Sequence, residues 1–223
     1  MTSTKYAVIG LGQFGSAIAR RLSEKGAEVI AIDVDEEKVE TIKEDVAYAV
    51  SLDSTDKKAL EAQNIHKMNA VVVSIGANFQ DLLLTCFQLQ ELGVERIIGR
   101  AQGKTQRRIL EKMGITEVLS PEFEVSTNMA EQLLNPGVLM CMSLPDTYEI
   151  IEIRAPKTLK DRTLGDIGLR EKYNLNLVTL LRKTGETYHI SGVPNVDSVV
   201  MEEDVIVVFG KKVDIDRFIE INS

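Results

Sequence analysis

The first 120 residues alternate between short apolar runs and amphipathic stretches with helical spacing. The apolar runs predict strands at 6–9, 29–32, 47–50, 70–75, 96–98 and 117–119. The helical spacing predicts helices at 14–25, 36–43, 57–63, 79–92 and 104–113. Near-continuous apolar strands that alternate with helices are typical of a parallel sheet covered on both faces, so the pattern predicts a doubly wound α/β domain.

Glycines and aspartates mark the ends of these predicted helices. Gly26, Gly93 and Gly114 each follow a helix where a C′ glycine is favoured, and Asp56 and Asp81 stand where N-caps are expected. These signals support the helix boundaries.

After Pro121 the pattern changes. A helix is predicted at 122–134, and the breaker Asn135-Pro136-Gly137 ends it. Beyond it the sequence predicts strands at 148–153, 177–182, 188–190 and 205–209, with helices at 164–173 and 212–221 and a hairpin turn at 183–186. We therefore expect a nucleotide-binding domain with a crossover helix at 1–135 and a smaller α+β domain at 136–223.

Composition and charge narrow the function. The chain has 34 acidic and 26 basic residues and a net charge of −8, which disfavours binding to nucleic acid or to an anionic bilayer. Its apolar runs are far shorter than the roughly 18 residues of a membrane span, and residues 1–5 lead into a strand without the apolar region of a signal peptide. We expect a cytoplasmic protein that reaches a membrane only through another protein. Two isolated cysteines and two histidines provide no cysteine pair or His-rich metal site.

The first predicted strand ends in the run GLGQFG at 10–15, and a helix follows directly. In this context Gly10 permits the tight turn, Gly12 lets the backbone approach a pyrophosphate, and Gly15 lets the helix pack closely on the strand. The free N–H groups at the helix start favour phosphate. The run therefore predicts a Rossmann-like nucleotide site, and a tight turn that binds nothing is the simpler alternative.

Asp33 ends the second predicted strand, 18 residues after Gly15, where a carboxylate can accept from ribose hydroxyls. Neither Val34 nor Asp35 is an arginine, so NADP is disfavoured. Helix capping is the alternative role for Asp33, although Asp35 is better placed for it. ATP, ADP and NAD all present the same ribose and diphosphate, and the choice among them stays open.

Catalytic residues are difficult to find beside this motif. The residue four positions after each tyrosine is not a lysine, and His66 and His189 have no convincing partner. Binding without turnover is therefore the better interpretation, so we expect no enzyme. A small NAD-dependent oxidoreductase is the alternative.

The chain resembles a known family in the run YAVIGLGQFG at 6–15 and the run AID at 31–33. Further matching segments are SLDST at 51–55, SIGAN at 74–78, RAQ at 100–102 and SPE at 120–122. The second half matches at Leu164, Asp166, Leu169, Arg170, Tyr173, Pro194 and the run EDVIVVFG at 203–210. Together these segments resemble the RCK-domain (KTN) regulatory subunits of Trk and Ktr potassium uptake systems.

This resemblance implies a regulatory protein that assembles as homodimers through the crossover helix and then as a homo-octameric ring. The ring would dock on an integral membrane potassium-translocating subunit of Trk or Ktr type at the inner face of the cell membrane. Exchange of ATP or NAD(H) against ADP would gate potassium flux. The resemblance places the nucleotide at Gly10, Leu11, Gly12, Gln13, Phe14, Gly15, Asp33, Val34, Asp53, Ser54, Ile75, Gly76, Ala77, Asn78, Arg100 and Glu122.

Further ligands follow from the same resemblance. Glu122 would take part in a divalent-cation site for Mg²⁺ or Ca²⁺. Cyclic di-AMP would bind the C-terminal domain at Ile167, Arg170, Asn176 and Pro194.

The sequence departs from the family pattern at Gln13, where the family often has an arginine that reaches the terminal phosphate of ATP. A neutral amide lacks the charge-assisted part of that bond, about 1–2 kcal/mol. Simpler structural roles stand beside four other assignments: a loop residue for Asp53, solvated charges for Arg100 and Arg170, and a first-turn acid for Glu122. The acidic run at 202–204 is predicted to be a solvated turn.

Overall fold

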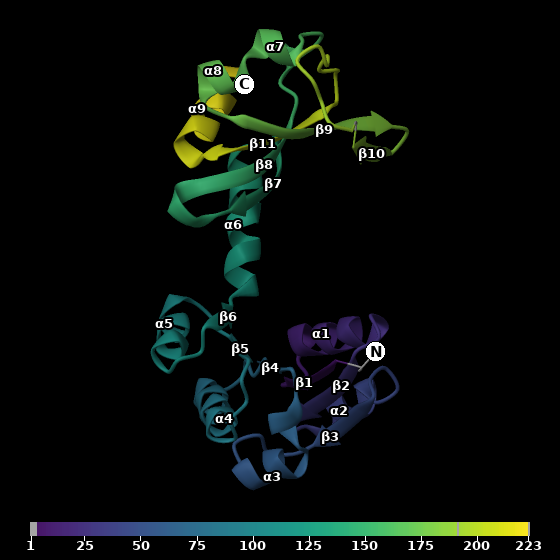
Figure 1. Cartoon of the computed structure of the whole chain (residues 1–223), viewed down its shortest axis with the longest axis vertical. Coiled ribbons are helices and arrows are strands. Elements are labelled where there is room, and N and C mark those ends of the chain that lie inside the picture. The colour runs from purple at the N-terminus through teal and green to yellow at the C-terminus, as the bar shows by residue number, and fades with distance from the viewer. Residues whose placement is uncertain (1–3, 191, 223) are drawn as a thin grey trace. The chain divides into compact units, whose positions relative to one another are not determined.

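The computed structural model describes residues 4–190 and 192–222. The chain divides into two compact units, Met1–Phe123 and Glu124–Ser223 (Figure 1). This division falls inside helix α6 (Pro121–Leu134), whereas the predicted boundary lies after residue 135. Among the described residues, no helix combines the length and apolarity needed to cross a bilayer.

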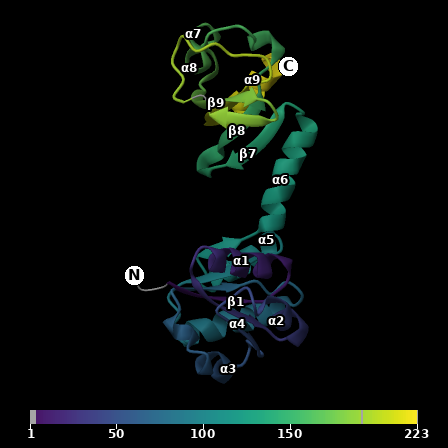
Figure 2. The same ribbon diagram turned by 90° about the vertical axis from the view of Figure 1, so that its right-hand side faces the viewer.

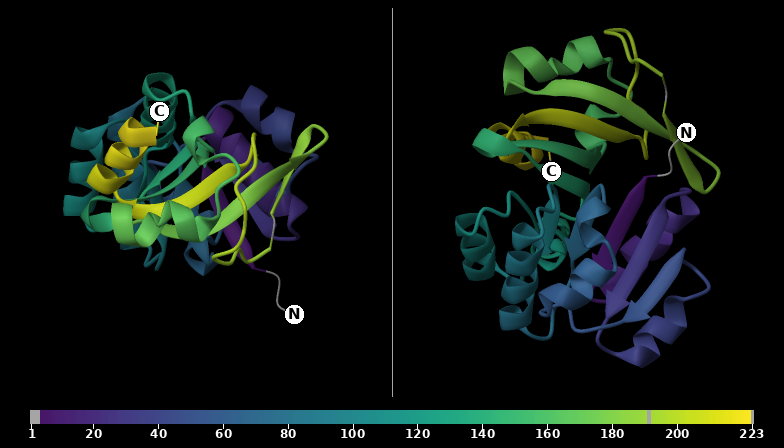
Figure 3. Two further views of the ribbon diagram at one scale, coloured as in Figure 1. Left: turned by 90° about the horizontal axis from the view of Figure 1, so that it is seen from above. Right: turned by 60° about the horizontal axis from the view of Figure 1, so that its bottom comes forward.

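Among residues 4–123, six parallel strands form one sheet in the order β3-β2-β1-β4-β5-β6 (Figure 3). The strands are β1 (Lys5–Ile9), β2 (Glu28–Asp33), β3 (Tyr48–Ser51), β4 (Ala70–Val73), β5 (Ile97–Arg100) and β6 (Glu117–Leu119). The chain runs outward from β1 to β3 and then restarts at β4 on the other side of β1. This reversal is the switch point at which doubly wound sheets bind ligands.

Helices cover both faces of this sheet. They are α1 (Gln13–Glu24), α2 (Glu36–Ile42), α3 (Lys57–Ala62), the 3₁₀ turn η1 (Ile65–Lys67), α4 (Phe79–Glu91) and α5 (Lys104–Lys112). The side chains of β1 alternate between the faces: Val8 packs in the cluster of α1 and α2, while Ile9 packs in the cluster of α3, α4 and α5. The predicted doubly wound α/β domain is therefore confirmed.

The predicted helix ends are confirmed with one correction. Gly26, Gly93 and Gly114 have φ values of 85°, 76° and 91°, which suit glycine after a helix. The N-cap of α4 is Asn78, whose side chain accepts from the Gln80 N–H, and not Asp81 as predicted. Asp81 lies in the first turn instead, where its charge favours the helix dipole.

The second unit contains one antiparallel sheet in the order β10-β9-β11-β8-β7. Its elements are β7 (Val138–Ser143), η2 (Pro145–Thr147), β8 (Tyr148–Arg154), η3 (Lys157–Leu159), α7 (Leu164–Ile167), α8 (Leu169–Tyr173), β9 (Asn176–Thr184), β10 (Thr187–Ile190), β11 (Val205–Lys211) and α9 (Lys212–Asn222). The helices and sheet share one core, in which the rings of Tyr173 and Phe218 meet edge to face at 5.0 Å.

Two features of this unit differ from the sequence interpretation. Strand β7 was not predicted, and it follows α6 directly after the breaker at 135–137 (Figure 2). The predicted helix at 164–173 is two short helices, because Gly168 adopts a left-handed conformation with φ 64°.

The prediction that the acidic run at 202–204 is a solvated turn is wrong for Asp204. Asp204 is only 1% exposed, so it is not part of a solvated turn. Its carboxylate accepts from the Met201 N–H at 2.9 Å and from the Arg182 guanidinium at 3.3 Å. These bonds satisfy the buried charge and fix the turn that leads into β11.

Helix α6 is joined to the second unit by polar contacts. The Asn128 side chain accepts from the Cys141 N–H at 2.9 Å, and the Gln132 side chain donates to the Leu139 carbonyl. Lys212 at the start of α9 pairs with Glu131 at 2.8 Å. These contacts attach α6 to the edge strand β7 and to α9.

Candidate functional site

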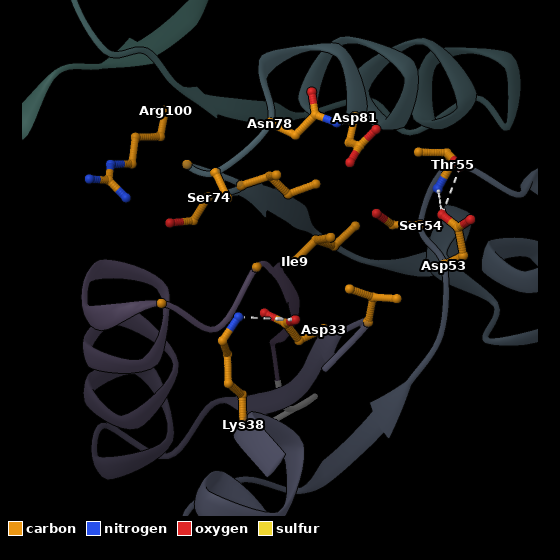
Figure 4. A pocket seen from close by; sticks show the side chains of 16 residues that line it. Ile9, Asp33, Lys38, Asp53, Ser54, Thr55, Ser74, Asn78, Asp81 and Arg100 are labelled. Atoms are coloured by element: carbon orange, nitrogen blue, oxygen red, sulfur yellow. Dashed lines mark hydrogen bonds and ion pairs between the residues drawn. The ribbon is translucent and has the colours of Figure 1, made fainter. Parts of the chain in front are cut away.

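A cavity of about 380 Å³ lies at the carboxyl ends of the strands of the first unit (Figure 4). The residues that line it follow five different strands: Ile9, Gly10, Gly12, Asp33, Val34, Lys38, Asp53, Ser54, Thr55, Ser74, Ile75, Gly76, Ala77, Asn78, Asp81 and Arg100. The cavity therefore opens beside β1 and β4, at the switch point of the sheet.

The glycine loop forms one wall of the cavity. Gly10 has φ 91°, and a Cβ on it would lie 2.8 Å from the Ile75 backbone nitrogen. A Cβ on Gly15 would overlap the carbonyl oxygen of Gly10. A Cβ on Gly12 would meet no atom within 4 Å, so Gly12 leaves open space at the cavity wall. The first and third glycines serve close packing, while the second keeps the approach to the backbone free.

Helix α1 begins at this loop without a side-chain cap. Gly12 is the N-cap residue, and the first turn of α1 holds no acidic residue. By contrast, Asp35 and Asn78 cap α2 and α4 with their side chains. The first N–H groups of α1 and its positive dipole end are therefore suited to an anion.

Asp33 joins the loop to the second strand. Its carboxylate accepts from the Leu11 N–H at 2.6 Å and from the Asp35 N–H at 2.9 Å, and it is 8% exposed. Lys38 lies 3.5 Å from the same carboxylate, as the dashed line in Figure 4 shows. Asp33 holds the loop in place and still lines the cavity, where its remaining lone pairs can accept from a ribose.

The opposite wall follows β3 and β4. Asp53 accepts from the backbone N–H and the hydroxyl of Thr55, and these bonds lower the pKa of its carboxyl, the hydroxyl most. The Ser54 hydroxyl lies 2.8 Å from that of Thr85 in α4. Since these groups already have partners, Asp53 and Ser54 shape this wall more than they offer unused hydrogen-bonding groups.

Arg100 enters the cavity from the end of β5. Its guanidinium lies 5.4 Å from the centre of the Phe14 ring and pairs with Glu122 at the start of α6. A hydrogen bond from Arg100 lowers the pKa of the Glu122 carboxyl. The Arg100 side chain is 15% exposed, so the simpler reading of it as a solvated charge does not fit.

The structure brings most of the predicted nucleotide residues to this cavity. Those that do not line it are Leu11, Gln13, Phe14, Gly15 and Glu122. Leu11 and Gln13 line a second hollow of about 410 Å³, together with Arg20 of α1 and Lys38 and Thr41 of α2. Phe14 and Glu122 contact Arg100, and Gly15 packs under Gly10.

Five cavity residues were absent from the prediction: Ile9, Lys38, Thr55, Ser74 and Asp81. Ile9, Thr55 and Ser74 adjoin predicted residues, and their position at or just beyond the end of a strand is a signal that could have found them. Lys38 and Asp81 enter from the first turns of α2 and α4, which strand ends alone do not indicate.

The residues predicted for cyclic di-AMP lie in the second unit. Ile167 is 1% exposed and belongs to the core, whereas Arg170 and Asn176 are exposed and Pro194 is half-buried. Within one chain the Ile167 side chain is thus covered. Among the described residues, no group of three His, Cys, Asp or Glu side chains is placed to hold a metal ion. The roles of these residues and of Glu122 with a cation stay predictions.

The fold and cavity define a class of protein: a Rossmann-type nucleotide domain followed by a small antiparallel domain. Residues 6–121 match the TrkA-N domain family, and residues 148–223 match the TrkA-C domain family. The chain is 36% identical over 214 residues to Ktr system potassium uptake protein C of Bacillus subtilis (strain 168), covering 96% of this chain and 95% of that protein. The chain belongs to this family of RCK-domain proteins of Ktr and Trk potassium uptake.

Two other proteins are similar to the chain. Ktr system potassium uptake protein A of the same organism is 34% identical over 214 residues, covering 96% of this chain and 95% of that protein. The GsuK channel bound to NAD superposes with a TM-score of 0.65 at 15% identity, covering 96% of this chain and 38% of that one. At that identity the likeness shows the fold alone.

Proposed function

We propose that this protein is a nucleotide-sensing regulatory subunit of a potassium uptake system. The observation that carries the proposal is the cavity at the switch point, with an uncapped helix start on one side and Asp33 on the other, in a chain of the Ktr family. The ligand is an adenosine nucleotide, ATP or ADP, or NAD(H). It binds without being turned over.

The regulation follows from differential binding. A ligand shifts a protein between two conformations only by as much as its affinity for them differs. The ion pair between Arg100 and Glu122 supports a route for this effect, because Arg100 lines the cavity and Glu122 stands in the first turn of α6. A phosphate that attracts Arg100 changes the contacts at the beginning of that helix.

Assembly into homodimers, and then into an octameric ring, belongs to the same proposal. Helix α6 carries large apolar side chains that are more than half exposed in one chain, at Phe123, Val125, Met129, Leu133 and Leu134. Such a row is suited to a second copy of the helix. The ring acts in the cytoplasm at the inner face of the membrane, docked on a potassium-translocating subunit of Trk or Ktr type.

Three finer assignments complete the proposal. The nucleotide domain extends to about residue 135 and includes α6, and the remaining residues form the C-terminal domain. Glu122 takes part in binding Mg²⁺ or Ca²⁺ together with ligands from a second chain or the nucleotide. Cyclic di-AMP binds the C-terminal domain through Arg170, Asn176, Pro194 and the backbone near Ile167.

The oxidoreductase alternative is not favoured by a specific observation. The described residues that line the cavity include no histidine, tyrosine or cysteine. These are common proton-transfer groups in enzymes. A redox reaction would therefore need a carboxylate such as Asp53 or Asp81, and Asp53 is already bonded to Thr55.

A charge-removal pair tests the proposed site. Asp33→Asn should weaken ADP and NAD binding at least 10-fold by calorimetry, because the amide loses acceptors for the ribose. Asp35→Asn is the matched control: it removes the same charge two residues away, keeps the α2 cap and should bind normally.

Light scattering with ADP and with ATP or NADH should give an octamer whose dimensions differ between ligands. The proposal fails if the wild-type protein binds none of these nucleotides or remains a monomer.

A further inference from the structure

Two polar atoms in the cavity region have unmet hydrogen-bonding capacity. Within the described part of the chain, Ser74 Oγ and Arg100 Nε are the buried side-chain atoms without a hydrogen-bond partner. Ser74 is 2% exposed, and the Arg100 side chain is 15% exposed. Leaving a buried donor unpaired costs free energy that a fold normally avoids. Two such atoms in the lining of one cavity point to a ligand that pairs them.

Glycines pack close to both side chains, where a larger residue would crowd them. A Cβ on Gly15 would lie 3.3 Å from Ser74 Cβ, and a Cβ on Gly76 would lie 3.3 Å from Arg100 Nη1. Figure 4 draws Ser74 and Arg100 on the side of the cavity that faces the glycine loop, away from Asp53. Both donors thus share the region of the cavity beside the uncapped start of α1.

We propose that Ser74 and Arg100 form a phosphate subsite for the phosphate farther from the adenosine. The Ser74 hydroxyl and the Arg100 Nε–H each donate to an oxygen of that phosphate. An anion fits because both groups are donors, one carries a positive charge, and the helix dipole adds to it. This inference rests on the proposed function and names residues that decide which nucleotides bind.

The subsite predicts that ligands with two phosphates bind more tightly than adenosine. Adenosine presents no phosphate to Ser74 and Arg100, and AMP places its single phosphate at the glycine loop. ADP and NAD carry a second phosphate, so they satisfy both unpaired donors. Their affinity should exceed that of adenosine by a margin that depends on Ser74.

Ser74→Ala tests this role with two readouts. Affinity for ADP should fall about 10-fold by calorimetry, while affinity for adenosine should change less than twofold. The melting temperature of the free protein should stay equal or rise, because the variant removes an unpaired buried hydroxyl. A purely structural serine would give the opposite change in melting temperature and no change in the ADP-to-adenosine ratio.

Ser120→Ala is the matched control. Ser120 is also a buried serine after a strand, but its hydroxyl accepts from Arg107 at 3.2 Å, and it does not line the cavity. This variant should lose some stability and keep the affinity for ADP. Arg100→Lys is the second variant, since it retains the charge and removes the Nε–H, and it should also lower the ADP-to-adenosine ratio.

The outcomes separate this inference from the proposed function. If the wild-type protein binds neither adenosine nor ADP, the proposed function fails. If the wild-type protein binds ADP and both Ser74→Ala and Arg100→Lys keep its ADP-to-adenosine ratio, the phosphate subsite is wrong and the nucleotide site stands.

Discussion

The contribution of Gly12 to nucleotide binding can be measured separately from its contribution to the stability of the fold. A Cβ at this position meets no atom within 4 Å, and the φ of −66° is accessible to alanine. Gly12→Ala therefore fits the unliganded protein without strain. The new methyl group stands in the open space at the N-terminus of α1, where a phosphate would approach the backbone.

The expected effects on folding and on binding differ in size. Alanine is a poorer N-cap than glycine by a few tenths of a kcal/mol or more, whereas the loss of freedom in the unfolded chain stabilises by about 0.4–1 kcal/mol. The net change in the free energy of unfolding should therefore stay within about 0.5 kcal/mol. A methyl group that blocks one backbone N–H from a phosphate removes about 1.5–3 kcal/mol of binding, or roughly 10-fold to 150-fold in affinity.

Urea unfolding and calorimetry with ADP measure the two effects on the same samples. Gly15→Ala provides the contrast, because its Cβ would overlap the Gly10 carbonyl oxygen and force α1 away from the strand. Overpacking of this kind costs about 1–3 kcal/mol, against a gain of about 1 kcal/mol in helix propensity. If Gly12→Ala bound ADP as tightly as the wild type, the reasoning that phosphate approaches at Gly12 would be refuted.

The remaining predictions concern the buried Asp204, the Cys86 thiol and the ion pair between Lys212 and Glu131. Asp204→Ala should lower the free energy of unfolding by about 2 kcal/mol in urea, because it leaves the Met201 N–H without its acceptor; a change below about 0.5 kcal/mol would contradict this. Burial raises the pKa of Cys86 from 9.0 to about 12, so its thiol should be alkylated at pH 8 about 1,000-fold more slowly than a free cysteine, unless the protein unfolds first. The pair with Glu131 raises the pKa of Lys212 above 10.5, so its stabilisation is complete below pH 10.5 and lost as the pH rises through the raised value. Glu131→Gln should lower stability at pH 7 by about 0.5–1 kcal/mol and flatten that alkaline loss in thermal melts.

The sequence predicted most of the N-terminal domain because its signals are local. Apolar strands, helix spacing and glycine ends all lie within a few residues of the elements they specify. Strand β7 was missed for the reverse reason. In the run 138–143, Val138 and Cys141 are buried while Met140 and Met142 are exposed, and a register shift between Val138 and Met140 breaks the period of two. An edge strand of this kind is recognised only once its neighbour β8 is in place.

The candidate site, too, could be predicted only where its signals are local in the sequence. The glycine loop and Asp33 follow from spacing, whereas the unpaired state of Ser74 depends on what surrounds it in three dimensions. Asp204 is similar: three consecutive acidic residues suggest a solvated turn, but Arg182 from β9 pairs with one of them and allows its burial. Partners that come from distant parts of the chain are not visible in local composition.

The charges around the cavity decide how the neutral Gln13, which stands where the family often has an arginine, affects phosphate binding. The lining holds three carboxylates, Asp33, Asp53 and Asp81, against the two cations Lys38 and Arg100. Lys38 is already close to Asp33 and Asp35, at 3.5 and 3.6 Å, so little of its charge is available to a ligand. Attraction for phosphate must then come from backbone N–H groups, the helix dipole and Arg100, which act over short distances. Since Gln13 adds no charge, each further phosphate brings repulsion with no new cation from this chain to offset it. These charges favour a diphosphate over a triphosphate, unless a divalent cation or a second subunit supplies the missing positive charge.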